Sequence, residues 1–217
     1  MGITPPIKTD DILIDWRTVG LFSTNSFLIV CQKTKAAALV DAAGDAEVLL
    51  EMIEAHDVTI QYLLQTHAHL DHVAALDQLK KATNAPILLH RDELQLYENV
   101  EMQCSLFGLP PVPSPPPPDR FVVEGEQFKI GELEVKVYET PGHTPGGISF
   151  SISRYLFSGD SLFAGSIGRT DLPGGDTNTL MASLQRFLTF SNDTMVFSGH
   201  GPVTTIGQER KFNPFLR

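Results

Sequence analysis

The chain has 217 residues, of which 42% are hydrophobic, so it is long enough to bury a real core. Its 26 acidic and 16 basic residues give a formal net charge of −10, which disfavours a broad phosphate-binding surface and so excludes nucleic acid as the expected partner. The N-terminus carries no basic stretch followed by an apolar run, and no apolar segment is long enough to cross a bilayer. We therefore expect a cytoplasmic protein that has no membrane partner.

Short β-type runs alternate with amphipathic helices in the first half of the chain. Strands are expected at 12–14, 26–30, 37–40, 58–64 and 86–89. Asp45 is expected to cap a helix whose shared apolar face consists of Val48, Leu49, Met52 and Ile53. A second helix is expected over 73–82, and Asp92 opens a third that must end before residue 109.

The second half begins after a proline-rich segment, 109–119, which predicts a stiff extended connector because consecutive prolines lack amide donors. Strands are expected after it at 121–123, 128–130, 133–137, 148–152, 155–157 and 194–197, with a helix over 179–190. Strand follows strand directly after the connector, so we interpret it as a bridge within one domain spanning 1–217. The pattern predicts a layered α/β fold in which two sheets face each other with helices outside.

The segment from Thr66 to His72 carries three imidazoles and one carboxylate, at His67, His69, Asp71 and His72. It comes immediately after a predicted strand and before a predicted helix. Imidazole and carboxylate are the common ligands of zinc and of iron or manganese, and a tight turn lets neighbouring side chains converge on one point. A loop that is histidine-rich by chance is a poor explanation for so ordered a motif.

Three further candidate ligands lie far away in sequence but in the same local setting. His143, Asp160 and His200 each follow a predicted strand, and each has glycine or proline beside it, which allows a sharp turn at the edge of a sheet. One histidine in such a loop would mean little by itself. Together with the first motif, the three residues complete a metal-binding constellation.

In order and spacing, these seven residues resemble the metallo-β-lactamase superfamily over nearly the whole chain. The resemblance implies a four-layer αββα sandwich with two divalent transition-metal ions, zinc first and iron or manganese as alternatives. By motif, it implies that one metal is held by His67, His69 and His143, that the other is held by Asp71, His72 and His200, and that Asp160 bridges them.

Within the superfamily the chain resembles short bacterial members of the glyoxalase II group, through residues 140–147, 168–176 and 213–216. The resemblance implies a thioesterase acting on small anionic thioesters such as S-lactoylglutathione through a metal-activated hydroxide, with Asp71 both ligating the metal and orienting the nucleophile. The β-lactamases are a poorer match, because Asp160 rather than cysteine stands at the bridging position, and we expect no hydrolysis of antibiotics. Full-length glyoxalase II proteins carry a C-terminal helical extension that binds glutathione, whereas this chain stops soon after His200. Glutathione itself is therefore left open as the substrate.

The nearest alternative is a persulfide dioxygenase of the same fold, which the sequence resembles through residues 168–171. In that family one iron is held by two histidines and one aspartate, here His67, His143 and Asp160, and the substrate would be glutathione persulfide. The sequence does not count the metals. A purely structural metal site is disfavoured, because seven ligands exceed the four that a closed structural zinc requires.

Two residues near the motifs have two interpretations each. Asp41 is expected either to accept a hydrogen bond from a ligand imidazole or to cap a turn. Arg169 is expected either to bind a substrate carboxylate in bidentate fashion or to form an internal ion pair with Asp171 or Asp176.

The remaining histidines and cysteines are expected to have no catalytic role. His56 and His90 fall outside the ligand motifs, and Cys31 and Cys104 read as two buried thiols. The oligomeric state is left open.

Overall fold

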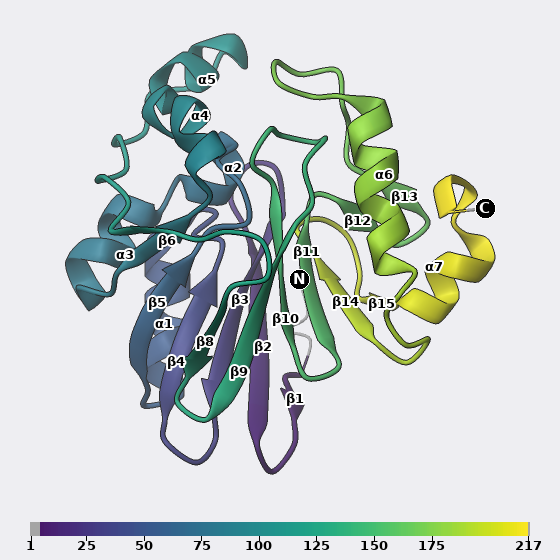
Figure 1. Cartoon of the computed structure of the whole chain (residues 1–217). Coiled ribbons are helices and arrows are strands. Elements are labelled where there is room, and N and C mark those ends of the chain that lie inside the picture. The colour runs from purple at the N-terminus through teal and green to yellow at the C-terminus, as the bar shows by residue number, and fades with distance from the viewer. Residues whose placement is uncertain (1–4, 217) are drawn as a thin grey trace.

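Two β-sheets face each other in the computed structural model of this chain, which describes residues 5–216 (Figure 1). The first sheet contains, in spatial order, β1 (Ile7–Lys8), β2 (Ile12–Val19), β3 (Thr24–Cys31), β4 (Ala36–Val40), β5 (Thr59–Leu64), β6 (Ile87–Leu89) and β7 (Arg120–Phe121). The second contains β15 (Thr204–Thr205), β14 (Met195–Ser198), β11 (Tyr155–Gly159), β10 (Ile148–Ile152), β9 (Leu133–Glu139) and β8 (Gln127–Ile130). A small hairpin pairs β12 (Leu162–Phe163) with β13 (Ser166–Ile167).

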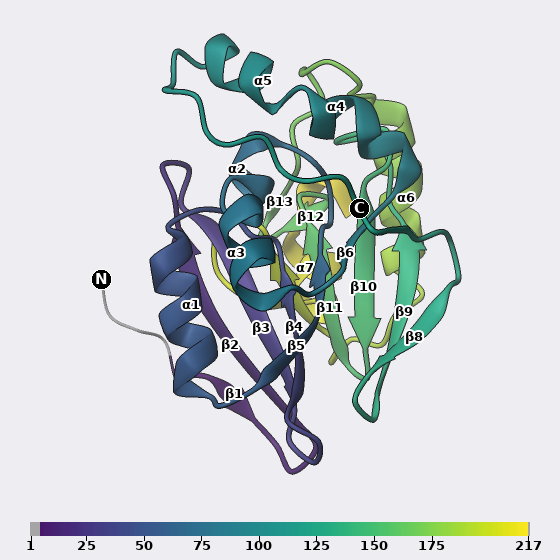
Figure 2. The same ribbon diagram turned by 90° about the vertical axis from the view of Figure 1, so that its left-hand side faces the viewer.

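Helices cover the outer faces of both sheets (Figure 2). The helices are α1 (Ala46–Ala55), α2 (Leu70–Val73), α3 (Leu76–Thr83), α4 (Leu94–Glu98), α5 (Val100–Leu106), α6 (Thr177–Phe187) and α7 (Ile206–Phe212), with 3₁₀ turns at Arg91–Glu93 and Pro214–Leu216. α1 and α3 lie outside the first sheet and α6 outside the second. The predicted layered α/β sandwich is therefore confirmed as helices, sheet, sheet and helices.

Side-chain alternation along β3 explains why the first sheet is buried on both faces. Phe27 and Ile29 point into the core between the two sheets, whereas Leu28 and Val30 point into the core beneath the helices. Successive residues of a strand face opposite sides, so a strand that buries every side chain must be covered on both faces. All eight residues of β3 are buried.

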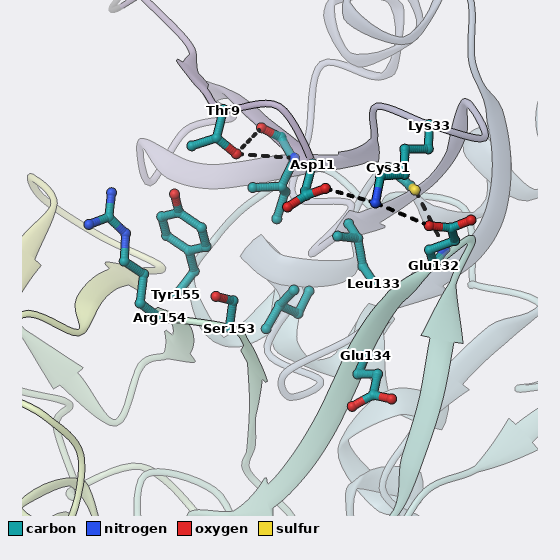
Figure 3. A pocket seen from close by; sticks show the side chains of 12 residues that line it. Thr9, Asp11, Cys31, Lys33, Glu132, Leu133, Glu134, Ser153, Arg154 and Tyr155 are labelled. Carbon is teal, nitrogen blue, oxygen red and sulfur yellow. Dashed lines mark hydrogen bonds and ion pairs between the residues drawn. The ribbon is translucent and has the colours of Figure 1, made fainter.

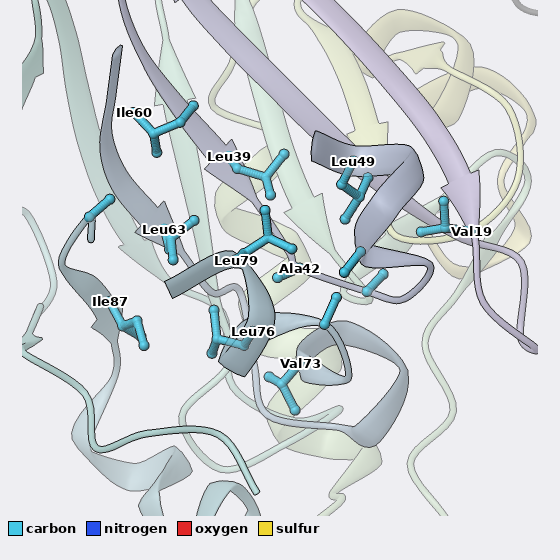
Figure 4. Close-up of a cluster of buried hydrophobic side chains, with 14 of the residues drawn as sticks. Val19, Leu39, Ala42, Leu49, Ile60, Leu63, Val73, Leu76, Leu79 and Ile87 are labelled. Atoms are coloured by element: carbon cyan, nitrogen blue, oxygen red, sulfur yellow. The ribbon is translucent and has the colours of Figure 1, made fainter. Parts of the chain in front are cut away.

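The helix-facing core of the first sheet is built from aliphatic side chains (Figure 4). Leu49 of α1 and both Leu76 and Leu79 of α3 pack with Leu39 and Leu63 of the sheet, all fully buried. On the opposite side of the molecule, a separate cluster joins α6 to the second sheet. Both sheets are thus fixed between layers, and only their loops are free to build a site.

Several element boundaries differ from the sequence-based predictions. The helix predicted over 73–82 is two helices, because the amide of Ala75 donates to the carbonyl of Ala42 (2.9 Å) and interrupts the helical ladder. Asp45 precedes α1 but makes no side-chain cap; its carboxylate accepts from the amide of Gly20 instead (2.8 Å). The helix predicted to open at Asp92 starts as a 3₁₀ turn and then divides into α4 and α5.

Candidate metal centre

All seven candidate ligands lie at one edge of the sandwich, just past the ends of strands. His67, His69, Asp71 and His72 follow β5, while His143 follows β9, Asp160 follows β11 and His200 follows β14. β11 and β14 are parallel neighbours, so the residues that follow them leave the sheet at the same edge. The site is therefore shared by loops of both sheets.

Three overlapping groups of side chains bring donor atoms within 4.8 Å of one another. The groups are His67, His69 and His143; His67, His72 and Asp160; and Asp71, His72 and His200. The first and third match the two ligand triads implied by the family resemblance. Asp160 lies between them, with Oδ1 3.4 Å from His72 Nε2 and Oδ2 3.6 Å from His143 Nε2.

Hydrogen bonds on the far side of the rings fix which nitrogen faces the site. Asp41 Oδ2 accepts from Thr66 Oγ1 (2.8 Å) and from Nδ1 of His72 (2.9 Å). The Thr66 proton is thus committed to Asp41, so the His67 Nδ1 that lies 3.0 Å from Thr66 Oγ1 must be the donor there. In neutral imidazoles this leaves Nε2 of both His67 and His72 as lone-pair donors aimed at the site. Of the two interpretations of Asp41, the structure shows the contact with a candidate ligand.

His143 is oriented in the same way by a backbone group. Its Nδ1 donates to the carbonyl of Arg169 (2.7 Å), and its Nε2 lies 2.9 Å from Nδ1 of His69. The backbone of residue 169 thus acts on the site directly, which the sequence motifs did not indicate.

The strongest indication that the site is built for a cation is a set of buried polar atoms without partners. Nε2 of His67, Nε2 of His72 and Oδ1 of Asp160 are buried and make no hydrogen bond within the described part of the chain. Burying such atoms unpaired costs about 1–3 kcal/mol each, and more for a charged group. All three belong to one donor group, and their chemistry is that of zinc, iron or manganese ligands. The residues present therefore fit a transition metal.

The protonation of the candidate ligands is strongly perturbed by this crowding. Burial, with the neighbouring imidazoles, lowers the pKa of His67 well below its usual value and that of His69 to about 3. Burial opposes the charged form of Asp160 as well, but His72 and His200 outweigh it and hold the pKa of Asp160 well below its usual range. For Asp71 too, burial acts upwards and is outweighed, chiefly by His72 and then by His200, so that its pKa is about 2. Both carboxylates are thus held ionised, the form that binds metal.

Two buried polar side chains support the ligand loops and were missed by sequence reasoning. Glu93 accepts from the amide of Ala68 (2.7 Å) with one oxygen and from the amide of Gly146 (2.7 Å) with the other, and so ties the first motif to the loop of His143. Gln103 of α5 accepts from the amide of Leu70 (2.8 Å) and donates to the carbonyl of Ala68 (3.0 Å). Their partners are backbone groups, which leave no pattern in the sequence around residues 93 and 103.

Small residues and hydroxyl groups complete the packing around the second triad. A Cβ on Gly199 would overlap Asp160 Oδ1 and the ring of His72, so only glycine allows the loop of His200 to approach them. Thr24 Oγ1 donates to Asp71 Oδ2 (2.8 Å), which lies 3.2 Å from His200 Nε2. Thr24 is a further contact that sequence reasoning missed.

Arg169 makes the internal ion pair that was one of its two interpretations. Its guanidinium donates twice to the carboxylate of Asp171 (2.7 Å each), and both side chains are more than half exposed. The pairing lowers the pKa of Asp171 to about 2. An exposed pair of this kind stabilises the fold little, and a substrate carboxylate could compete for the same fork.

The histidines and cysteines without an expected role lie away from these three groups. His56 contacts Asp15 (2.8 Å), and His90 contacts Glu139 (3.2 Å). Cys31 and Cys104 are buried free thiols, as predicted.

A cavity of about 490 Å³ lies at the opposite end of the sheets, where β3 ends and β9 begins (Figure 3). Its Lys33 is already paired with Asp11 (3.0 Å) and Glu132 (3.4 Å).

Among the described residues no helix is long and apolar enough to cross a membrane.

The family model of the metallo-beta-lactamase superfamily matches residues 19–200, a span that contains all seven candidate ligands. A curated relative, hydroxyacylglutathione hydrolase GloC of Haemophilus influenzae, is 41% identical over 91% of this chain and 95% of its own length.

Two solved structures are similar over nearly their whole length. A B3 metallo-beta-lactamase, BLEG-1, has a TM-score of 0.88 and 38% identity, covering 94% of this chain and 99% of its own. TTHA1623, in a di-iron-bound form, has a TM-score of 0.83 and 39% identity, covering 92% of this chain and 98% of its own.

Proposed function

This chain belongs to the metallo-beta-lactamase superfamily, and on that premise we propose that it is a binuclear metallohydrolase that cleaves small anionic thioesters of the S-lactoylglutathione type. The observation that carries the proposal is the set of unpartnered donor atoms on His67, His72 and Asp160, shared between two triads. A single ion would use only part of the seven candidate ligands. The similarity to a hydroxyacylglutathione hydrolase and to a di-iron protein supports the substrate class and the metal count respectively.

In this proposal His67, His69 and His143 would hold the first ion, Asp71, His72 and His200 would hold the second, and Asp160 would be a ligand of both. Metal ions at these positions would polarise an acyl carbonyl and lower the pKa of a bound water towards neutrality.

The chain's own residues contribute preorganisation to this chemistry. Asp41 and Thr66 hold the rings of His72 and His67 with Nε2 forward, and the carbonyl of Arg169 does the same for His143. Thr24 holds the carboxylate of Asp71, whose oxygen also orients the attacking nucleophile. Ligands locked in this way need no rearrangement when the reaction begins. A thiolate leaving group requires no general acid, because its pKa is low compared with that of an alkoxide or amine.

The experiment that tests the proposal pairs metal analysis with turnover on one preparation. We expect two transition-metal ions per chain and hydrolysis of S-lactoylglutathione, both lost in Asp160→Ala, which removes the anionic ligand between two cations. Near-normal metal content and turnover in that variant would contradict the site assignment.

Two counter-assays separate the alternatives. Oxygen uptake with glutathione persulfide, one iron per chain and dispensable His72 and His200 would indicate the persulfide dioxygenase instead. If the protein hydrolyses a chromogenic cephalosporin faster than any thioester, it is a β-lactamase instead. One of the structural neighbours is named as such an enzyme.

A further inference from the structure

An apolar cavity of about 330 Å³ opens beside Asp71, within the ~300–1,000 Å³ range of ligand pockets. Four segments form its walls: the turn between β2 and β3, the loop between β4 and α1, the α2–α3 region, and the start of the proline-rich segment 109–119. The lining includes Leu21, Phe22, Asp45, Asp71, Ala74 and Leu109.

The lining excludes anionic groups and favours hydrocarbon. Its two charged side chains are both acidic, and one of them, Asp45, is occupied by the amide of Gly20 (2.8 Å). Leu21 is 79% exposed and Phe22 is 40% exposed, although both are large hydrophobic side chains. Exposed apolar side chains that gather at a concave surface, rather than singly, mark a binding site.

The outer wall is rigid before any ligand arrives. Proline fixes its own backbone φ, and the connector is anchored at the amide of Leu109, which donates to the carbonyl of Cys104 (2.9 Å). Further along, Tyr97 Oη donates to the carbonyl of Pro116 (2.6 Å). Phe22 packs edge-to-face on Phe107 with ring centroids 5.6 Å apart, which joins the β2–β3 turn to the end of α5. A preformed apolar wall binds with little ordering cost.

The cavity adjoins the candidate metal centre, because Asp71 belongs to both. We propose that this cavity is the acyl subsite of the enzyme and that it selects thioesters whose acyl group carries an apolar chain. The inference rests on the proposed thioesterase function. The acyl side is assigned here, rather than the glutathione side, because the carboxylates of glutathione would meet acidic side chains and no cation in this lining.

The test is a series of S-acyl glutathiones on the metal-loaded protein. From acetyl through butanoyl to hexanoyl, kcat/KM should rise about twofold to fourfold for each added methylene, the value of burying one CH₂ group. In Leu21→Ser, which removes part of the apolar wall, and in Ala74→Leu, which fills the cavity, the ratio of kcat/KM for hexanoyl to kcat/KM for acetyl should shrink at least tenfold.

The matched control is Leu106→Ser, which removes another exposed leucine, 65% exposed, from outside the lining. It should keep the chain-length series. Equal rates for all three acyl groups in an active enzyme would overturn the subsite but leave the thioesterase intact.

A protein that hydrolyses no thioester would instead overturn the proposed function, and binding of the free acids then decides about the cavity. Calorimetry should give at least tenfold tighter binding of hexanoate than of acetate, an advantage lost in Leu21→Ser. Equal binding of the two acids would overturn the subsite by itself.

Discussion

Arg169 has two parts that serve the site differently. Its backbone carbonyl orients His143 whatever the side chain does, whereas its guanidinium lies in an exposed fork with Asp171. A substitution at this position therefore removes the guanidinium without removing the backbone contact to His143.

We predict that Arg169→Ala raises KM for anionic thioesters about tenfold to a hundredfold with unchanged metal content, the loss expected for a charge-assisted contact. Asp171→Asn is the matched control: it frees the guanidinium, so KM should stay the same or fall. An Arg169→Ala protein with unchanged KM for every anionic substrate tested would rule out the recognition role and leave the internal ion pair as its function.

Glu93 is a second single residue whose substitution should have a measurable effect. Burial raises the pKa of its carboxyl group, yet both oxygens accept backbone amides from the two ligand loops. In Glu93→Gln an NH₂ group faces one of these amides, donor against donor, at a cost of about 2 kcal/mol.

For a chain of this length that cost corresponds to a Tm about 4–8 °C lower, measured by calorimetry. Glu98→Gln, on the exposed side of α4, should melt within about 1 °C of the unsubstituted protein. Equal melting of the two variants would show that Glu93 is not a clamp between the loops.

Helix α5 supports the first motif although it carries no candidate ligand. α5 contributes Gln103, whose side chain bonds both sides of the segment that carries His69 and also the carbonyl of Leu96 (2.9 Å). We predict that Gln103→Ala unpairs these backbone groups and speeds hydrogen exchange at the amide of Leu70 by at least tenfold, measured by NMR. Gln95→Ala, exposed on α4, serves as control and should leave that amide protected.

Among the helices and strands, the sequence predicted those that have a long apolar pattern. It missed those whose bounds are set by contacts with residues distant in sequence. β9, β10, β11 and α6 lie where periodicity placed them, because their buried faces are encoded locally. The two-residue strands of the β12–β13 hairpin carry no such pattern. The break between α2 and α3 was also unpredictable, since its cause is the carbonyl of Ala42, more than thirty positions away.

In the candidate site too, the features encoded locally were predicted and those set by distant contacts were mostly missed. Seven candidate ligands were visible because four of them crowd into one motif after a strand, and the other three follow strands beside glycine or proline. Among their supports, only Asp41 was predicted, as one of its two interpretations. Thr24 and Glu93 act through partners distant in sequence, so their roles appear only in the folded chain.

The two sheets share one core, and this bears on the prediction of a single domain over 1–217. Phe27 and Ile29 of the first sheet pack in one cluster with Phe150, Phe157 and Phe197 of the second. Separating the halves would expose all of these side chains, so the shared cluster couples the two halves. We predict one calorimetric transition whose van't Hoff and calorimetric enthalpies agree, measured on metal-loaded protein. Two resolved transitions would divide the chain into two domains.

The metal centre should act as a clamp on the whole molecule, because its ligands come from the loops of both sheets. Four candidate ligands follow β5 of the first sheet and three follow strands of the second. A metal ion that binds only the folded state stabilises that state by about 4 kcal/mol when the free metal concentration is a thousand times its Kd. Removing it should lower Tm by about 8–16 °C for a chain of this size.

A chelator titration followed by thermal melting measures this shift without reference to turnover. Asp160→Asn keeps the size of the side chain but not its charge. Before any chelator is added, its Tm should therefore already be lower than that of the unsubstituted protein, and the chelator should lower it by less than about 3 °C more. Ser151→Ala, in β10 and away from the ligands, should show the full shift. A chelator effect of equal size in Asp160→Asn would mean that the stabilising ion lies elsewhere, and that the proposed ligands do not tie the two sheets together.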